Sequence, residues 1–160
     1  MFKRPLPVET MAQICDEAEK YEVVALDRDF LDRTFTRIDQ SIAMATLFAA
    51  FHLKVKAIAA LTDSGSTALW MSRHDCGRPI YALTPRIASQ RKMALYRNVV
   101  PLFLEQSHDR DEVLRAAEEL LLNKGEVQRG DLIVLTVGEP MGKSGGTNTM
   151  KIVQVGGQRP

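Results

Sequence analysis

The sequence has little of several features that define whole classes of protein. It contains two cysteines, Cys15 and Cys76, among 160 residues, and neither lies in a CxxC or Cys/His cluster. A disulfide scaffold and a zinc finger are therefore excluded, and reduced thiols are expected. No apolar run approaches the ~18 residues of a membrane span, and the start MFKRPLPVETM lacks the core of a signal peptide. We expect a cytoplasmic location and no membrane partner.

An excess of charge of one sign is also absent. Lysine and arginine number 21 and aspartate and glutamate 20, which leaves a formal net charge of +1. The chain has no bulk field to attract nucleic acid, so we expect no nucleic-acid partner and only local anion sites. The hydrophobic content of 45% is sufficient for one core, and the length suits one domain with an appendage.

The amino-terminal part differs in pattern from the rest. Met11, Ile14, Cys15 and Ala18 recur at helical spacing and predict a helix over residues 8–21. A polar, charge-rich stretch then leads to residue 37 and is interpreted as a linker.

From residue 38 onward, short apolar runs alternate with helical patterns. We expect strands at residues 55–61, 79–83, 99–104, 132–137 and 150–155. The first expected helix covers residues 39–53, and the second follows TDSGST and ends near Gly77. The third covers residues 84–96, and the fourth runs from residue 107 or 109 to residue 125. This alternation predicts a parallel sheet with helices on both faces. Pro101 marks an edge strand, because proline cannot donate to the ladder. The last connection has no helical pattern, so the fifth strand should be antiparallel.

The expected fold is thus α/β, with three layers (α/β/α) and a mixed sheet of four parallel strands and an antiparallel last strand. Finer features are predicted for three helices. The apolar stripe of the 39–53 helix is Met44, Leu47, Phe48 and Phe51. Thr84 is expected to cap the helix that begins at Pro85, and Ser107 or Asp109 to cap the later one.

Gly142, Lys143 and Ser144 raise the question of a P-loop. A Walker loop has four residues between its glycines, whereas Gly138 and Gly142 enclose three, and Ser144 leads into GGTN rather than a helix. A glycine-rich loop between two strands is the favoured interpretation.

The loop TDSGST, residues 62–67, joins a predicted strand directly to a helix. Ser64, Ser66 and Thr67 offer hydroxyls, Gly65 can adopt positive φ, and a helix start presents free N–H groups. These groups suit a phosphate monoester, although Asp63 opposes an anion unless it points away. An ordinary N-cap by Ser64 or Ser66 explains the same residues, so both interpretations stay open on the loop alone.

Other candidate residues carry less signal. His52, His74 and His108 are scattered without metal-ligand spacing and are interpreted as surface residues. Arg86, Arg91 and Arg97 are interpreted as a solvated helix face, from which one arginine can reach a ligand.

Several motifs in order resemble the C-terminal domain of the pyruvate kinase family. PVETMAQICDEAE is similar to that family's last barrel helix, and SIAMATLFAAFHLKVKAIAALTDSGSTALWMSR to the first helix, strand and effector loop of its C-terminal domain. PIYALT, ALYRNVVP, GDLIVLTVGEP and GGTNTMKIV continue the match. The resemblance implies a barrel-domain remnant and linker at residues 1–37 and an α/β domain at residues 38–160.

The resemblance also implies a role in regulation. Thr62, Ser64, Gly65, Ser66 and Thr67 would bind the phosphate of an allosteric effector, and a loop containing Gly142, Lys143, Ser144 and Gly145 would fold over it. Relatives that bind a bisphosphate carry an arginine, and often a tryptophan, in the region where this chain has Gln106 and Val113. A sugar monophosphate or AMP is therefore the expected partner, together with a second copy of the chain in a homo-oligomer.

The resemblance places no catalytic residue in this chain. The catalytic lysine, the metal-binding carboxylates and the phosphate-contacting arginine of the family belong to barrel segments that have no counterpart here. Phosphoryl transfer needs those groups, so no catalysis and no cofactor are expected of this chain alone, with Mg²⁺ and K⁺ confined to the barrel of the parent enzyme. The alternative is a free-standing dimerisation module that binds no small ligand.

Overall fold

The computed structural model describes residues 6–20, 34–105, 107, 109–140 and 146–157. Helices and strands follow one another along these residues in the expected alternation. Their bounds are α1 (Leu6–Lys20), α2 (Ile38–His52), β1 (Ala57–Leu61), α3 (Ser66–Ser72), β2 (Ile80–Thr84), α4 (Ile87–Met93), β3 (Val99–Phe103), α5 (Arg110–Asn123), β4 (Leu132–Gly138) and β5 (Thr147–Gln154).

The strands form a five-stranded sheet in the order β3-β2-β1-β4-β5. The pairs β1/β2, β2/β3 and β1/β4 are parallel, and β4/β5 is antiparallel, as predicted from the helix-free last connection. Pro101 lies in the edge strand β3, which confirms the prediction made from its missing N–H.

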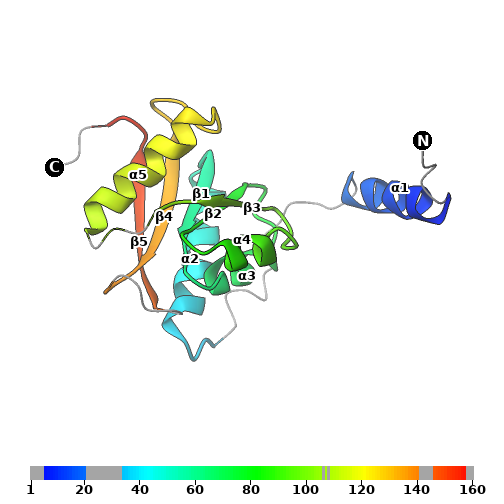
Figure 1. The fold of residues 1–160 in the computed structure, drawn as a ribbon, viewed down its shortest axis with the longest axis horizontal. Coiled ribbons are helices and arrows are strands. Elements are labelled where there is room, and N and C mark those ends of the chain that lie inside the picture. The colour runs from blue at the N-terminus through cyan, green and yellow to red at the C-terminus, as the bar shows by residue number, and fades with distance from the viewer. Residues whose placement is uncertain (1–5, 21–33, 106, 108, 141–145, 158–160) are drawn as a thin grey trace.

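Helices cover both faces of the sheet, which confirms the three-layer fold (Figure 1). In one core cluster, buried side chains of α2, α3 and α4 pack against one face of the sheet, which includes Ile58 and Ala60 of β1. The other joins α5 to the alternate β1 residues Ala57, Ala59 and Leu61. Successive strand residues point to opposite faces, so a strand buried on both faces is apolar throughout its length.

The apolar stripe predicted for α2 is rotated in the structure. The buried face of α2 comprises Asp39, Ala43, Met44, Thr46, Leu47 and Ala50. Phe48, which was expected in that stripe, is 43% exposed. Small alanines face the sheet because they allow the helix to pack closely, and hydrophobicity alone does not reveal this preference.

Two predicted helix caps had different outcomes. Thr84 is the last residue of β2, and α4 begins at Ile87 after Arg86, so the predicted start was wrong. Thr84 Oγ1 nevertheless accepts a hydrogen bond from the Arg86 N–H at 3.2 Å. Asp109 caps α5 as expected, because its carboxylate accepts from the N–H groups of Asp111 and Glu112 at 2.8 and 3.2 Å.

The amino-terminal helix α1 lies outside this layered packing. Its described side chains, residues 7–18, are all exposed, including the apolar Val8, Met11 and Ile14. No helix in the described part of the chain is long and apolar enough to cross a membrane.

Candidate functional site

The strand order brings two loops together at one end of the sheet. The chain runs outward from β1 to β2 and β3, and then returns to the other side of β1 to form β4. In such sheets, ligands bind outside the carboxyl ends of the strands where the order reverses, here between β1 and β4. The loops that follow β1 and β4 are those singled out in the sequence.

The loop after β1 ends in a left-handed glycine. Gly65 has φ +82° and precedes α3, and its N–H donates to Thr62 Oγ1 at 3.0 Å. Among the described residues, no side chain caps α3, so the structure does not show the alternative of an ordinary cap by Ser64 or Ser66; their hydroxyls instead lie 3.3 Å apart. A β-carbon on Gly65 would lie 2.8 Å from Met93 Cγ, so glycine also allows α3 to approach α4 closely.

The start of α3 presents backbone donors that no described residue accepts from. Among the described residues, the N–H groups of Ser66, Thr67 and Ala68 have no hydrogen-bond acceptor. The first N–H groups of any helix lack a partner within the helix, and they point to where an anion binds. Thr62 and Thr67 are buried beside them, whereas Ser64 and Ser66 are partly exposed.

Asp63 is held by the neighbouring segment, which reduces the repulsion that its carboxylate would exert on an anion at this loop. Its carboxylate forms an ion pair with Arg86, and this contact raises the pKa of the arginine guanidinium. Its backbone carbonyl accepts a hydrogen bond from Ser89 Oγ at 2.7 Å. The loop is thereby tethered to α4, with its negative charge paired.

The predicted second loop is described only at its two ends. Gly142, Lys143, Ser144 and Gly145 lie outside the described residues. At the ends of the loop, the Asn148 side-chain amide accepts from the Glu139 N–H at 3.0 Å and donates to the Glu139 carbonyl at 2.7 Å.

A buried hydroxyl pair joins the two loops. Thr67 Oγ1 and Thr147 Oγ1 lie 2.7 Å apart, which links the first turn of α3 to the first residue of β5. Gly138 approaches the same region, since a β-carbon there would lie 2.8 Å from the backbone of Gly146. The loop after β4 therefore begins and ends beside the loop after β1.

The other candidate residues lie apart from this site. His52 is exposed and His74 is half-buried, while His108 lies outside the described residues. Within the described part of the chain, no group of three His, Cys, Asp or Glu residues can hold a metal. Cys15 and Cys76 are free thiols, as expected. Val113 lies on the buried face of α5 and is 3% exposed, so its side chain cannot contact a second phosphate, while Gln106 lies outside the described residues.

Sequence reasoning missed three contacts of the loop, made by Arg86, Ser89 and Thr147. Arg86 was assigned to a solvated face, and Ser89 and Thr147 were not singled out. The sequence did contain a signal for the ion pair: Arg86 comes two residues after the end of one strand, and Asp63 comes two residues after the end of the preceding strand. The carboxyl ends of adjacent parallel strands meet at one edge, so such residues are brought together.

The fold defines the chain as an α/β domain with a mixed five-stranded sheet, and the strand order reverses between β1 and β4, where the two loops lie. Comparison with known proteins adds the family: the model of "Pyruvate kinase, alpha/beta domain" matches residues 40–153. The chain is 40% identical over 147 residues to the pyruvate kinase of Buchnera aphidicola subsp. Schizaphis graminum, covering 91% of this chain and 31% of that protein. It is 38% identical over 149 residues to pyruvate kinase II of Salmonella typhimurium, covering 92% of this chain and 31% of that protein.

The chain belongs to the pyruvate kinase family, through its α/β domain. It spans about a third of the length of the curated relatives that it matches.

Proposed function

We propose that this chain is the regulatory domain of a pyruvate kinase and binds the phosphate group of a metabolite at residues 62–67. The parent enzyme would transfer a phosphoryl group from phosphoenolpyruvate to ADP in the cytoplasm, as a step of glycolysis, by means of a catalytic barrel. The barrel would supply the catalytic residues and hold the Mg²⁺ and K⁺, so this chain would contribute regulation rather than chemistry.

One observation carries the proposal. The N–H groups of Ser66, Thr67 and Ala68 have no acceptor among the described residues, next to partly exposed hydroxyls. A phosphate monoester has oxygens enough to satisfy several such donors, and the start of α3 adds a partial positive charge. The pairing of Asp63 with Arg86 reduces the repulsion that a free carboxylate would exert.

The shape of the site favours one phosphate over two. Val113, at the position proposed for a second phosphate contact, is buried in the core. A sugar monophosphate or AMP would need only the cradle at residues 62–67, with the loop that includes Lys143 closing on it.

Calorimetry on the 160-residue chain tests this site. Ribose 5-phosphate, glucose 6-phosphate and AMP are titrated in a buffer free of phosphate and sulfate, and at least one should bind saturably. Inorganic phosphate should compete with it, because the cradle contacts mainly the phosphate group. If none of the three ligands produces a saturable heat of binding, the proposal is contradicted.

Signal transfer would run through the described contacts of the loop. Thr67 touches Thr147 at the start of β5, and Asp63 touches Arg86 and Ser89 before and within α4. The exposed apolar residues of α1 would pack on the barrel of the parent enzyme. Allosteric coupling through such contacts typically amounts to about 1–3 kcal/mol.

A second function, self-association, is favoured by the exposed edge of the sheet. β5 is the outer strand, and its Ile152 is 41% exposed. Phe48 on α2 is exposed to a similar degree, and α2 packs beside β5. An unpaired strand edge with apolar neighbours is suited to a symmetric dimer.

Sedimentation velocity across a hundredfold range of concentration tests the association. Wild type should shift from monomer to dimer, and Ile152→Lys should remain monomeric at the highest concentration. A wild-type chain that stays monomeric throughout would leave the effector site as the only function proposed for it.

A further inference from the structure

Two helices of this domain end in the same backbone motif, but with different residues at its left-handed position. After α5, Gly125 has φ +75°; its N–H donates to the Leu122 carbonyl, and the Glu126 N–H donates to the Leu121 carbonyl. After α2, Lys54 has φ +52° and the corresponding bonds reach Phe51 and, from Val55, Ala50. Glycine is the usual residue at this position, because a β-carbon there is strained.

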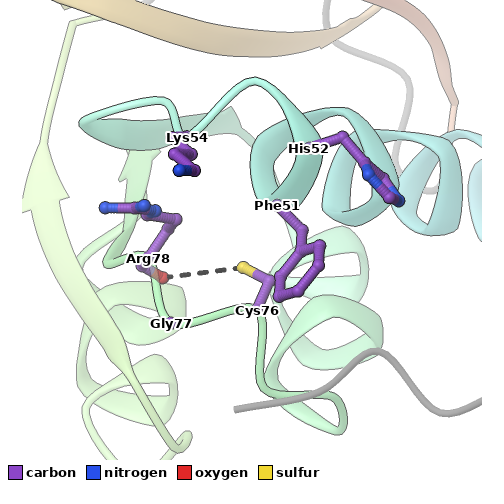
Figure 2. A pocket seen from close by; sticks show the side chains of 6 residues that line it. All are labelled: Phe51, His52, Lys54, Cys76, Gly77 and Arg78. Carbon is purple, nitrogen blue, oxygen red and sulfur yellow. Dashed lines mark hydrogen bonds between the residues drawn. The ribbon is translucent and has the colours of Figure 1, made fainter.

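Lys54 lies at the rim of a pocket at the amino-terminal ends of β1 and β2. The pocket has a volume of about 380 Å³ and is lined by Phe51, His52, Lys54, Cys76, Gly77 and Arg78. Figure 2 shows Lys54 and Arg78 on one side of it, with the Phe51 ring beside Cys76 on the other. This end of the sheet is opposite to the 62–67 loop, which follows the carboxyl end of β1.

Hydrogen bonds hold the segment that forms one wall. Asn98 Nδ2 donates to the Arg78 carbonyl at 2.7 Å, and the Gly77 N–H donates to Asp75 Oδ1 at 2.7 Å. Cys76 is 2% exposed and its thiol lies 3.9 Å from the Arg78 carbonyl (Figure 2). The wall is therefore preorganised rather than formed on binding.

Within the described part of the chain, the positive charges at the rim have no ion-pair partner. Among the described residues, no carboxylate forms an ion pair with Lys54 or Arg78. The nearby acid, Asp75, is already bonded to the Gly77 N–H and to Arg97. Burial raises the pKa of the Cys76 thiol, so the floor beside Phe51 is neutral near pH 7.

We propose that this pocket binds a small organic anion, a carboxylate with a flat apolar body. The carboxylate lies between the Lys54 ammonium and the Arg78 guanidinium, and the apolar body lies against the Phe51 ring and the Cys76 sulfur. Ligand pockets commonly combine an apolar lining with a few convergent polar groups, and this volume is within their range. A fully hydrated inorganic anion would leave the apolar side of the pocket unused.

Backbone-amide NMR of the 160-residue chain locates such binding directly. Benzoate is the probe, and benzyl alcohol is its neutral counterpart of similar size. Benzoate should shift the amides of Phe51 and Gly77, with a dissociation constant on the order of 1 mM for so small a probe. Equal shifts with benzyl alcohol, or benzoate shifts confined to residues 62–67, would overturn the proposal.

Because Lys54 has a strained backbone, a substitution there can raise stability while it lowers benzoate affinity, so the two effects can be told apart. Lys54→Gly removes the charge and relieves the strained backbone, so the midpoint of thermal unfolding should rise by about 2–4 °C. Benzoate affinity, read at the Gly77 amide, should nevertheless fall roughly threefold to fivefold. The double variant Lys54→Gly/Arg78→Gln should bind benzoate roughly tenfold or more weakly than wild type.

A matched control uses the lysine that ends the other helix. Lys124 caps the carboxyl end of α5, on the opposite face of the sheet, so Lys124→Gln should leave benzoate affinity unchanged. Lys54→Met keeps a side chain at the strained position and should weaken benzoate as Lys54→Gly does. Unchanged affinity in both Lys54 variants, or an equal loss in Lys124→Gln, would refute the role of Lys54.

Discussion

The two ends of the mixed sheet carry the two proposed anion sites, which are built in opposite ways. At the carboxyl end, residues 62–67 offer hydroxyls and backbone N–H groups, and the nearest carboxylate, Asp63, is paired with Arg86. At the amino end, the proposed pocket relies on the side-chain cations Lys54 and Arg78 above an apolar floor.

Helix direction explains the difference. Helices begin at the carboxyl ends of parallel strands and end before the amino ends of the next strands. The carboxyl end of the sheet therefore lies near helix amino termini, which carry a partial positive charge, and the amino end lies near helix carboxyl termini, which carry a partial negative charge. Backbone groups alone can therefore attract an anion at residues 62–67. At the other end, carbonyl groups dominate, and an anion requires charged side chains. Lys54 also complements the carboxyl end of α2, and Val55 and Lys54 already bond its last carbonyls.

The largest expected effect breaks one site and spares the other. Ser66→Asp places a carboxylate at the first position of α3, where it competes with phosphate for the free N–H groups. Binding of a phosphorylated effector should fall by more than about 100-fold, because like charges a few ångströms apart repel strongly. Calorimetry measures this loss, and Ser66→Ala should lose only roughly fivefold.

The fold of the Ser66→Asp variant should remain intact, since an acidic residue in the first turn stabilises a helix. Benzoate should still bind at the amino end of the sheet with wild-type affinity. Loss of both ligands would show that the two ends are not independent.

A backbone change at the carboxyl end should cost stability. Gly65→Ala introduces a β-carbon at φ +82° and 2.8 Å from Met93 Cγ, which forces the methionine to move. We expect the free energy of unfolding to fall by about 2 kcal/mol in urea denaturation. Gly130→Ala is the control, because its φ is +95° but its β-carbon meets no atom within 4 Å. An equal loss in the two variants would eliminate the contact with Met93 as a cause.

A change in the middle of the sheet should affect stability and neither site. Tyr81 in β2 donates a hydrogen bond to Glu126 at 2.6 Å, and burial together with this carboxylate raises the pKa of Tyr81 to about 12. Tyr81→Phe should lower the free energy of unfolding by about 1.5 kcal/mol at pH 8, because Glu126 loses its donor.

The pH dependence of Tyr81→Phe has a defined sign. The folded-state pKa of Tyr81 exceeds the unfolded value of about 10, so the tyrosine contributes fully below pH 10. Its contribution disappears as the pH rises towards 12. The difference between wild type and Tyr81→Phe should therefore shrink between pH 8 and pH 11.5 in denaturant titrations. A constant difference across this range would exclude Tyr81 ionisation as its source.

The smallest expected effect tests whether Arg86 acts on the proposed carboxyl-end site through Asp63. Arg86→Ala leaves the Asp63 carboxylate without its cation, so a phosphorylated effector should bind roughly fourfold more weakly. Adding Asp63→Asn should restore the affinity, since the repelling charge is then gone. If the double variant binds as weakly as Arg86→Ala, Arg86 contacts the ligand directly instead of acting through Asp63.

Most of the fold could be predicted from the sequence because each element carried a local signal. Runs such as AIAAL indicate buried strands, Pro101 indicates an edge, and the helix-free segment after β4 indicates an antiparallel return. The errors concern orientation and boundaries: Phe48 is exposed because Ala43 and Ala50 provide closer packing, and Thr84 ends a strand instead of capping a helix. Those outcomes depend on tertiary contacts that periodicity does not encode.

The candidate sites were predictable to different degrees. The hydroxyls of residues 62–67 are contiguous, so their convergence follows from one turn. The contacts with Arg86 and Thr147 join segments far apart in the chain and required the strand order. The amino-end pocket was missed altogether, because it combines residues 51–54 with residues 76–78. A lysine in a left-handed conformation has no signature in sequence.

The left-handed Lys54 has a consequence for protein engineering. A stabilisation protocol that scores backbone strain would choose glycine at this position, as the end of α5 already has it. The resulting protein should survive more heat and still lack one of the two charges that line its pocket. A thermal screen alone would count that loss as an improvement.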